Sequence, residues 1–411
     1  MEEVEIPQYF ICPISLQIMK DPVTAITGIT YDRDSIERWL FTNNNTICPV
    51  TKQPLPLDSD LTPNHTLRRL IQAWCTQNAS LGVDRIPTPK PPLTKSQALK
   101  ILHNFHLHPH RRLPILTQLE LLAAENDRNK KCLIDAGVPK AVLLFLLDCF
   151  KSRQLHQGLQ QALSLLQFVR IPSEEIKAVI SENDQILDSL VWILGCEIVE
   201  SDSVSVKSHA LIVLKTIIHK AGSGILERLE PEFFERIVRI LRKGITQQGM
   251  NAGLKVMVAA CPWGRNRKMM VDAGAVWELI EIELGIPERR TTELVLEILF
   301  HLCSCANGRA QFVSHRGGIA VITERVLKIS RSVDERAVFI LSLISNSSYG
   351  SHMVIQEMLK LGTVSKLCML LQSDHPTYLK EKAMEMLKAH SEVWKNSPCF
   401  PDRSFYASLH K

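Results

Sequence analysis

The sequence predicts a mainly α-helical protein, in which a small α+β domain is followed by a right-handed α-solenoid of about six helical repeats. Three observations predict this class. Two Cys-Pro dipeptides flank a charged helical segment near the N-terminus, a proline-rich stretch follows, and the remaining chain repeats a helical pattern. A chain of 411 residues also exceeds the usual single domain of about 100–200 residues.

The N-terminal segment has the spacing of a zinc-binding module but lacks its ligands. Its Cys-Pro dipeptides begin at Cys12 and Cys48 and enclose the segment DRDSIERWL. A cross-braced RING domain needs about four Cys or His ligands for each of two zinc ions. Residues 1–75 contain Cys12, Cys48, His65 and Cys75 as the available ligands. We therefore expect no metal and no cofactor, and a domain held together by its core and by polar side chains.

Four motifs occur in one order over residues 5–78: CPISLQIMKDPV, GITYDRDSIERWL, CPVTKQPL and LTPNHTLRRLIQAW. Together they resemble the U-box, the zinc-free relative of the RING domain found in ubiquitin ligases. A linker over 79–94 follows, and its prolines block helix formation and favour an extended spacer.

The segment NKKCLIDAGVPKAVLLFLL (129–147) recurs as NRKMMVDAGAVWELIEIEL (266–284), with weaker copies at 308–327 and 354–371. Helices starting near Asp184 and Pro231 fill the long gap. A period of about 40–47 residues made of helices alone is typical of armadillo or HEAT arrays. The N-x-x-x-hydrophobic-x-x-A-G pattern is similar to armadillo repeats in particular, which we expect over 95–395, with an irregular tail at 396–411.

Each copy contains a glycine before its third helix, where we expect a sharp turn in which a Cβ would clash. These residues are Gly137, Gly274, Gly318 and Gly362. A U-box, a proline linker and armadillo repeats together resemble the plant U-box ubiquitin ligases. The segment CPWGRNR (261–267) is similar to members linked to stress and defence signalling.

The resemblance implies a site without a catalytic nucleophile, since ligases of this type position a charged conjugating enzyme. By motif matching, the contacts to that enzyme are Ile14, Leu16, Trp39 and Pro49, and Lys52 is the candidate linchpin that touches both ubiquitin and the conjugating enzyme. Other interpretations remain open. Ile14 and Leu16 could be core residues of a short strand, Trp39 a core aromatic, and Lys52 a solvated lysine without the planar fork of arginine.

Polar residues of the central motifs are expected to replace the metals by hydrogen bonds near turns and the start of a helix. They are Asp21, Tyr31, Asp32, Arg33 and Glu37. Cys12 and Cys48 have no base or cation beside them in the sequence that would lower a thiol pKa, so we interpret both as small core residues.

Two Thr-Pro dipeptides are minimal sites for proline-directed phosphorylation, at Thr62 and at Thr88 in the linker. The histidine run HNFHLHPHRR is interpreted as a surface cluster, because a proline interrupts it.

The net charge of +5 comes without a dense basic cluster, so nucleic acid is not an expected partner. No apolar run approaches the roughly 20 residues that span a membrane. The odd total of 11 cysteines argues against a disulfide framework and favours reduced thiols in the cytoplasm or the nucleus.

The leading hypothesis is a ubiquitin-protein ligase. Its partners would be a conjugating enzyme, ubiquitin, a protein substrate on the armadillo repeats, and a second copy through the U-box. An adaptor that uses the U-box for dimerisation alone is the alternative, although it would not need the contact residues. A transport receptor would need a regular ladder of Trp and Asn, which six tryptophans do not supply.

Overall fold

The computed structural model describes residues 5–42, 45–56, 59–86, 93–155, 157–169, 171–183, 185–198, 200–346 and 351–395. The chain divides into two compact units, Met1–Val142 with Ser164–Ile171, and Leu143–Leu163 with Pro172–Lys411. The predicted tail at 396–411 and the prolines of 87–92 lie outside the described residues.

An antiparallel sheet of three short strands lies in the N-terminal domain, in the order β2-β1-β3. Strand β1 (Pro22–Thr24) pairs with β2 (Thr30–Asp32) and with β3 (Thr62–Pro63). The turn between β1 and β2 contains Gly28, whose φ of 78° is a left-handed conformation that glycine adopts without a steric penalty.

Helix α1 (Arg33–Glu37) follows β2 directly and continues into the π-helical turn η2 (Arg38–Thr42). Helix α2 (His65–Gln77) follows β3, and the side chain of Asn64 caps it by accepting a hydrogen bond from the Leu67 N–H at 3.0 Å. The short 3₁₀ turns η1 (Gln8–Phe10) and η3 (Ala79–Leu81) lie near the two ends of this domain.

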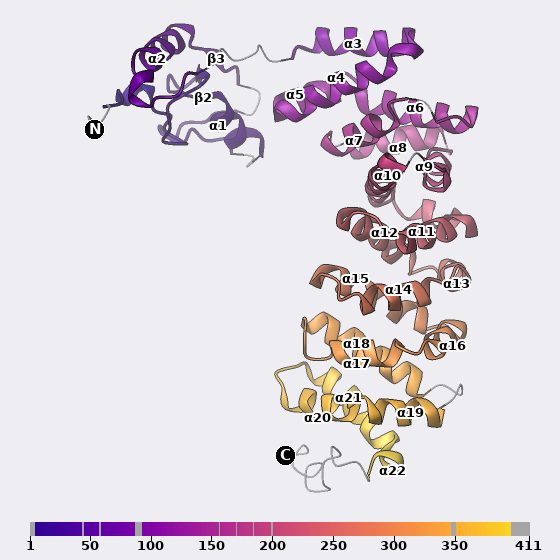
Figure 1. Cartoon of the computed structure of the whole chain (residues 1–411). Coiled ribbons are helices and arrows are strands. Elements are labelled where there is room, and N and C mark those ends of the chain that lie inside the picture. The colour runs from indigo at the N-terminus through magenta and orange to yellow at the C-terminus, as the bar shows by residue number, and fades with distance from the viewer. Residues whose placement is uncertain are drawn as a thin grey trace. The chain divides into compact units, whose positions relative to one another are not determined.

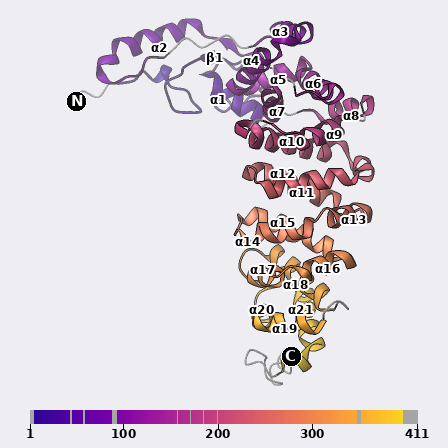
Figure 2. The same cartoon turned by 45° about the vertical axis from the view of Figure 1, so that its right-hand side comes forward.

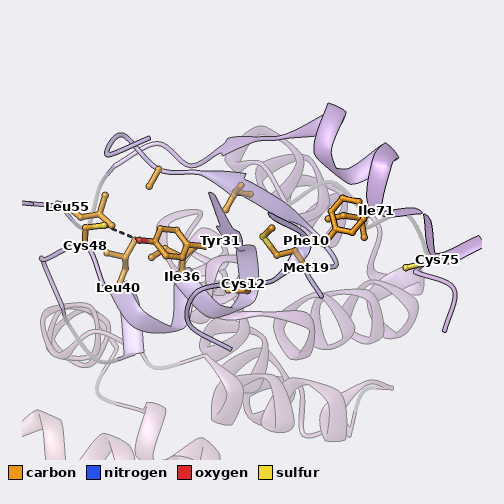
Figure 3. Close-up of a cluster of buried hydrophobic side chains, with 12 residues drawn as sticks. Phe10, Cys12, Met19, Tyr31, Ile36, Leu40, Cys48, Leu55, Ile71 and Cys75 are labelled. Atoms are coloured by element: carbon orange, nitrogen blue, oxygen red, sulfur yellow. Dashed lines mark hydrogen bonds between the residues drawn. The ribbon is translucent and has the colours of Figure 1, made fainter. Parts of the chain in front are cut away.

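The core of the N-terminal domain is a cluster of buried side chains contributed by its turns, strands and helices (Figure 3). Tyr31 of β2, Ile36 of α1 and Ile71 of α2 are almost completely buried. Burying one such large side chain contributes about 1.5–3 kcal/mol. The cluster consists of Phe10, Cys12, Met19, Val23, Ala25, Tyr31, Ile36, Leu40, Cys48, Leu55, Ile71 and Cys75.

The described residues from 95 onward are mainly helical. The helices are α3 (Lys95–Leu107), α4 (Arg112–Glu125), α5 (Asp127–Asp135), α6 (Val138–Ser152), α7 (Leu159–Phe168), α8 (Ser173–Glu182), α9 (Ile186–Gly195), α10 (Glu200–Ala221), α11 (Pro231–Lys243), α12 (Gln247–Ala260), α13 (Gly264–Asp272), α14 (Ala275–Leu284), α15 (Arg289–Cys303), α16 (Ala306–Ser314), α17 (Gly318–Arg325), α18 (Arg331–Ser345), α19 (Ser351–Lys360), α20 (Thr363–Gln372), α21 (Thr377–Ala389) and α22 (Ser391–Trp394), with the 3₁₀ turns η4 (Pro109–Arg111) and η5 (Ser223–Arg228).

Within the second unit the long helices α10, α12, α15, α18 and α21 form a stack in which each packs against the next (Figures 1 and 2). We call this stack the helix ladder. Apolar side chains such as Leu254, Ile298 and Leu341 are completely buried along this ladder. No repeat could bury these faces alone, because the neighbouring repeat supplies the opposing surface. The predicted α-solenoid is thereby confirmed.

The repeat glycines are required for two different reasons. Gly137, Gly274 and Gly362 have φ values of 81°, 80° and 77°, and no neighbouring atom lies within 4 Å of the place that a Cβ would take. Glycine is therefore needed at these positions because the backbone is left-handed, and not because a Cβ would clash as expected. At Gly318, in contrast, a Cβ would lie 2.9 Å from the carbonyl oxygen of Phe312. The predicted clash therefore applies to this one copy.

The segment CPWGRNR is a structural joint between helices. Nη1 of Arg267 donates to the carbonyl oxygen of Cys261 at 2.7 Å, just after the end of α12. Arg309 makes the equivalent bond to Cys303 at 3.0 Å, at the end of α15. Both arginines satisfy carbonyl groups that a helix end leaves without partners. This segment thus has a structural role in the fold.

Candidate functional site

Two turns of the N-terminal domain, CPISLQ (12–17) and CPVTKQ (48–53), share one hydrogen-bond pattern. In each turn the cysteine N–H donates to the carbonyl oxygen of the glutamine at 2.8 Å, and the cysteine carbonyl accepts from Leu16 at 2.9 Å or from Lys52 at 3.1 Å. Leu16 and Lys52 both adopt left-handed conformations, with φ of 55° and 60°. Such a conformation costs a non-glycine residue about 1–2 kcal/mol, so the surroundings must hold the turns in place.

The sulfur of Cys48 is the centre of the contacts that hold the second turn. It shares a hydrogen bond of 3.0 Å with the Tyr31 hydroxyl and accepts from Thr27 Oγ1 and from the Thr51 N–H, both at 3.4 Å. Burial disfavours the thiolate, but hydrogen bonds from Thr27, Thr51 and Tyr31 outweigh it and lower the pKa of Cys48 to about 6. Burial raises the pKa of Tyr31, and the hydrogen bond to Cys48 raises it further. The Tyr31 hydroxyl therefore stays protonated and acts as the hydrogen-bond donor to the sulfur of Cys48.

The sulfur of Cys12 holds the first turn in a similar way. It accepts a hydrogen bond from the Asp32 N–H at 3.3 Å. Burial opposes ionisation here too, but backbone N–H groups, that of Ser15 foremost, lower the pKa of the Cys12 thiol. The thiol pKa values are therefore lowered by hydrogen-bond donors in the folded turns and not by a base or a cation beside either cysteine. Both cysteines have 0% exposure, so no external group can reach either sulfur.

Strand β2 links the two turns through consecutive residues. The side chain of Tyr31 contacts the second turn, whereas the backbone N–H of Asp32 contacts the first. The carboxylate of Asp32 accepts from the N–H groups of Lys20 at 2.7 Å and Asp21 at 2.9 Å. This carboxylate therefore holds the segment that follows the first turn. It does not cap α1, although Asp32 occupies the N-cap position of that helix. Burial raises the pKa of this carboxyl.

A chain of ion pairs connects α1, α2 and the residue before β1. Asp21 accepts from Arg33 Nε at 2.6 Å and from Arg68 Nη1 at 3.2 Å, and Arg33 also lies 3.5 Å from Glu37. Burial raises the pKa of Glu37, and the charge of Arg33 opposes that rise. Of these residues, Arg68 was not singled out for the polar network from the sequence, because α2 is remote from Asp21 along the chain.

Apolar side chains are exposed on and beside the two turns. Leu16 is 76% exposed, Ile47 is 52% exposed and Val50 is 49% exposed. Trp39 lies beside the second turn, since its Nε1 donates to the Ile47 carbonyl oxygen at 2.9 Å. Ile47 and Val50 were not among the contact residues predicted from the sequence. Val50 could have been found, because it occupies in CPVTKQ the place of Ile14 in CPISLQ.

The remaining predicted contact residues are less exposed. Ile14 and Trp39 are partly buried and pack against the core cluster. Pro49 is partly buried as well, and its carbonyl oxygen accepts a hydrogen bond from Lys52 Nζ at 2.9 Å. The Lys52 ammonium is therefore folded back over its own turn.

The two candidate phosphorylation sites differ in what the structure describes. Thr62 is exposed in β3, and its backbone pairs with Thr24 of β1. Thr88 lies outside the described residues. Within the described parts of the chain, no group of three or more His, Cys, Asp or Glu residues could hold a metal ion. In the histidine run, α3 ends at Leu107 before Pro109.

A small domain with two equivalent turns, joined to a helical-repeat array, defines the class of this protein, and the comparisons with known proteins give its family. The family model for the U-box domain matches residues 6–80, and the model for the plant U-box protein ARM repeat region matches residues 96–411.

Three curated relatives from Arabidopsis thaliana match almost throughout. E3 ubiquitin-protein ligase PUB24 is 42% identical, over 97% of this chain and 95% of its own. PUB23 is also 42% identical, over 99% and 98%, and PUB22 is 38% identical, over 99% of both. An engineered protein of known structure aligns at a TM-score of 0.52 and 18% identity, over 71% of this chain and 67% of its own, which supports the fold alone.

This chain belongs to the plant U-box ubiquitin-protein ligases with armadillo repeats. It is accordingly a ubiquitin transferase that forms no covalent intermediate with ubiquitin. Across the described residues, none of the helices combines the length and apolar character needed to span a bilayer.

Proposed function

We propose that the two turns bind the ubiquitin-charged conjugating enzyme through a surface that we call the two-turn surface. It consists of Ile14, Leu16, Trp39, Ile47, Pro49 and Val50. The observation that carries the proposal is the exposure of Leu16, Ile47 and Val50 on turns whose backbones are held by buried sulfur atoms. Exposed apolar side chains on a rigid support are suited to docking a partner, because little ordering is needed on binding.

In this mechanism the ligase supplies geometry and no nucleophile. The substrate lysine amine attacks the C-terminal carbonyl carbon of ubiquitin, which is held as a thioester on the cysteine of the conjugating enzyme. An amide bond forms, the carbon–sulfur bond breaks to release the cysteine thiolate, and the amine proton passes to water or to that thiolate. Holding both reactants in place converts an encounter between molecules into a nearly unimolecular step. The Lys52 ammonium, which contacts the Pro49 carbonyl in the free protein, would turn outward to donate to ubiquitin and the conjugating enzyme.

The armadillo repeats are proposed to hold the protein substrate, in the cytoplasm or the nucleus. The similarity of CPWGRNR to stress- and defence-linked members supports a role in plant stress or immune signalling. A homodimer through the U-box is proposed on the resemblance to the family. Phosphorylation of exposed Thr62, and of Thr88, would add charge beside the start of α2 and in the linker.

The test is a reconstituted reaction with activating enzyme, a conjugating enzyme, ubiquitin and ATP. Leu16→Ala removes an apolar side chain that is 76% exposed, so the fold should be unaffected while polyubiquitin formation falls about tenfold. The matched control is Leu70→Ala, which removes a 52% exposed leucine from α2. Equal activity of both variants and the wild type would refute the surface. No product with any conjugating enzyme would favour the adaptor.

A further inference from the structure

A pocket of about 720 Å³ opens between α10, α12 and α15 in the second unit. Five of its lining residues are cations or histidine, namely Lys215, His219, Lys220, Lys255 and Arg290, and none of the lining residues is acidic. The apolar residues of the lining include Ile218, Leu226, Val256 and Leu294, which are almost completely buried. The pocket therefore has an apolar floor and a cationic rim.

Two of the rim lysines lack acidic partners among the described residues. Lys215 on α10 is partly buried and Lys255 on α12 is exposed, and neither forms an ion pair with a described carboxylate. Burial, and then the charge of Lys255, lower the pKa of Lys215. Two cations held close together without a counter-charge are suited to binding an anion.

The two carboxylates of α15, Glu293 and Glu297, are paired with arginines. Glu297 lies 2.5 Å from Arg336 on α18, and Glu293 lies 3.2 Å from both Arg289 and the rim residue Arg290. Within the pocket lining, Lys215 on α10 and Lys255 on α12 therefore remain as cations without a carboxylate beside them. A positively charged pocket of this kind favours a negatively charged partner.

A second pair of lysines extends the positive surface along α10. Lys207 and Lys243 line a neighbouring pocket of about 530 Å³, together with one carboxylate, Glu197. Lys207 and Lys215 lie on one face of α10, separated by about 12 Å at 1.5 Å per residue. A single phosphate cannot span that distance, whereas an extended peptide of about four residues does.

We propose that this pocket binds an extended acidic segment of a protein substrate, with an apolar side chain on the pocket floor and Asp or Glu side chains at the rim. The inference rests on the proposed function, since it names the substrate class that the armadillo repeats present to the charged conjugating enzyme. Carboxylates spaced along the segment pair with Lys215 and Lys255, and more distant ones reach Lys207 and Lys243.

The test measures binding of a fluorescein-labelled peptide of about ten residues to the full chain by fluorescence anisotropy. The probe has a central leucine flanked by alternating Glu and Gly, and the comparison peptides replace Glu with Lys, or with Gln and one phosphoserine. Charge reversal by Lys215→Glu together with Lys255→Glu should weaken binding of the Glu probe by about tenfold for each lysine. Raising the salt concentration should weaken it as well.

The matched control reverses two exposed lysines outside the pocket, Lys268 on α13 and Lys388 on α21, and alters the net charge equally. Equal losses in both double variants would show a general charge effect and overturn the proposal. Preference for the phosphoserine peptide would assign the pocket to phosphate and also overturn it. Ubiquitin chain formation by the wild type is measured in parallel: intact chain formation without probe binding refutes the pocket alone, whereas absent chain formation refutes the proposed function.

Discussion

Removing one hydroxyl group should loosen the second turn without altering its packing. Tyr31→Phe keeps the buried ring but deletes the donor that lies 3.0 Å from Cys48 Sγ. A buried hydrogen bond contributes about 0.5–1.5 kcal/mol, and here the sulfur keeps its contacts to Thr27 and Thr51. We therefore expect the free energy of local opening to fall by about 1 kcal/mol, which increases the open population about fivefold.

Hydrogen exchange of the full chain, followed by mass spectrometry, measures this opening directly. Exchange should accelerate about fivefold in peptides that cover 45–56, while peptides from the second unit should be unaffected. The matched control is Tyr9→Phe, which deletes a hydroxyl from a tyrosine that is 65% exposed. If the two variants exchange alike across 45–56, the bond to Cys48 does not stabilise the turn.

Three further perturbations follow from the same structure. Asp21→Asn removes the charge that pairs with buried Arg33 and should destabilise the N-terminal domain by about 3 kcal/mol, visible as faster exchange in α1 and α2. The pKa of Cys48 is lowered from 9.0 to about 6, so its thiolate stabilises the fold fully above about pH 9. This contribution is lost as the pH falls to about 6. Protection of residues 45–56 from exchange, corrected for intrinsic exchange, should therefore increase as the pH is raised from about 6 to about 9. Gly274→Ala forces a β-carbon into a backbone with φ of 80° and should cost about 1–2 kcal/mol in thermal unfolding.

Each of these has its own control. Asp34→Asn removes an exposed carboxylate from the first turn of α1, and a loss as large as that of Asp21→Asn would show that the ion pair is unimportant. Cys48→Ala should abolish the dependence on pH, and an unchanged profile would assign it to another group. Gly274→Asn should be milder than alanine because asparagine tolerates the left-handed region, so equal losses would point to crowding instead.

The fold could be predicted because its determinants are local. The copies of one helical pattern carry their glycines and apolar positions within short segments, and stacking then follows from faces that a single repeat cannot bury. The reason for each glycine could not be predicted. Gly274 precedes the first residue of α14 and needs a left-handed backbone, whereas Gly318 is itself the first residue of α17 and needs a close approach to Phe312.

The site could be predicted where the motifs are contiguous and not where the contacts are distant. CPISLQ and CPVTKQ indicate two equivalent turns, but two of the donors around Cys48, Thr27 and Tyr31, come from outside these turns. The partnership of Arg68 with Asp21 spans 47 residues of chain. Neither the lowered thiol pKa nor this ion pair has a signal within a single motif.

The most direct measurement is discharge of a conjugating enzyme charged with ubiquitin, in a single turnover with free lysine as the acceptor. The wild-type chain should accelerate loss of the thioester, Trp39→Ala should fail to do so while remaining folded, and no reducible ubiquitin adduct should form on the ligase. A reducible adduct on this chain, or equal acceleration by Trp39→Ala, would contradict a ligase that works by positioning the thioester on its two-turn surface.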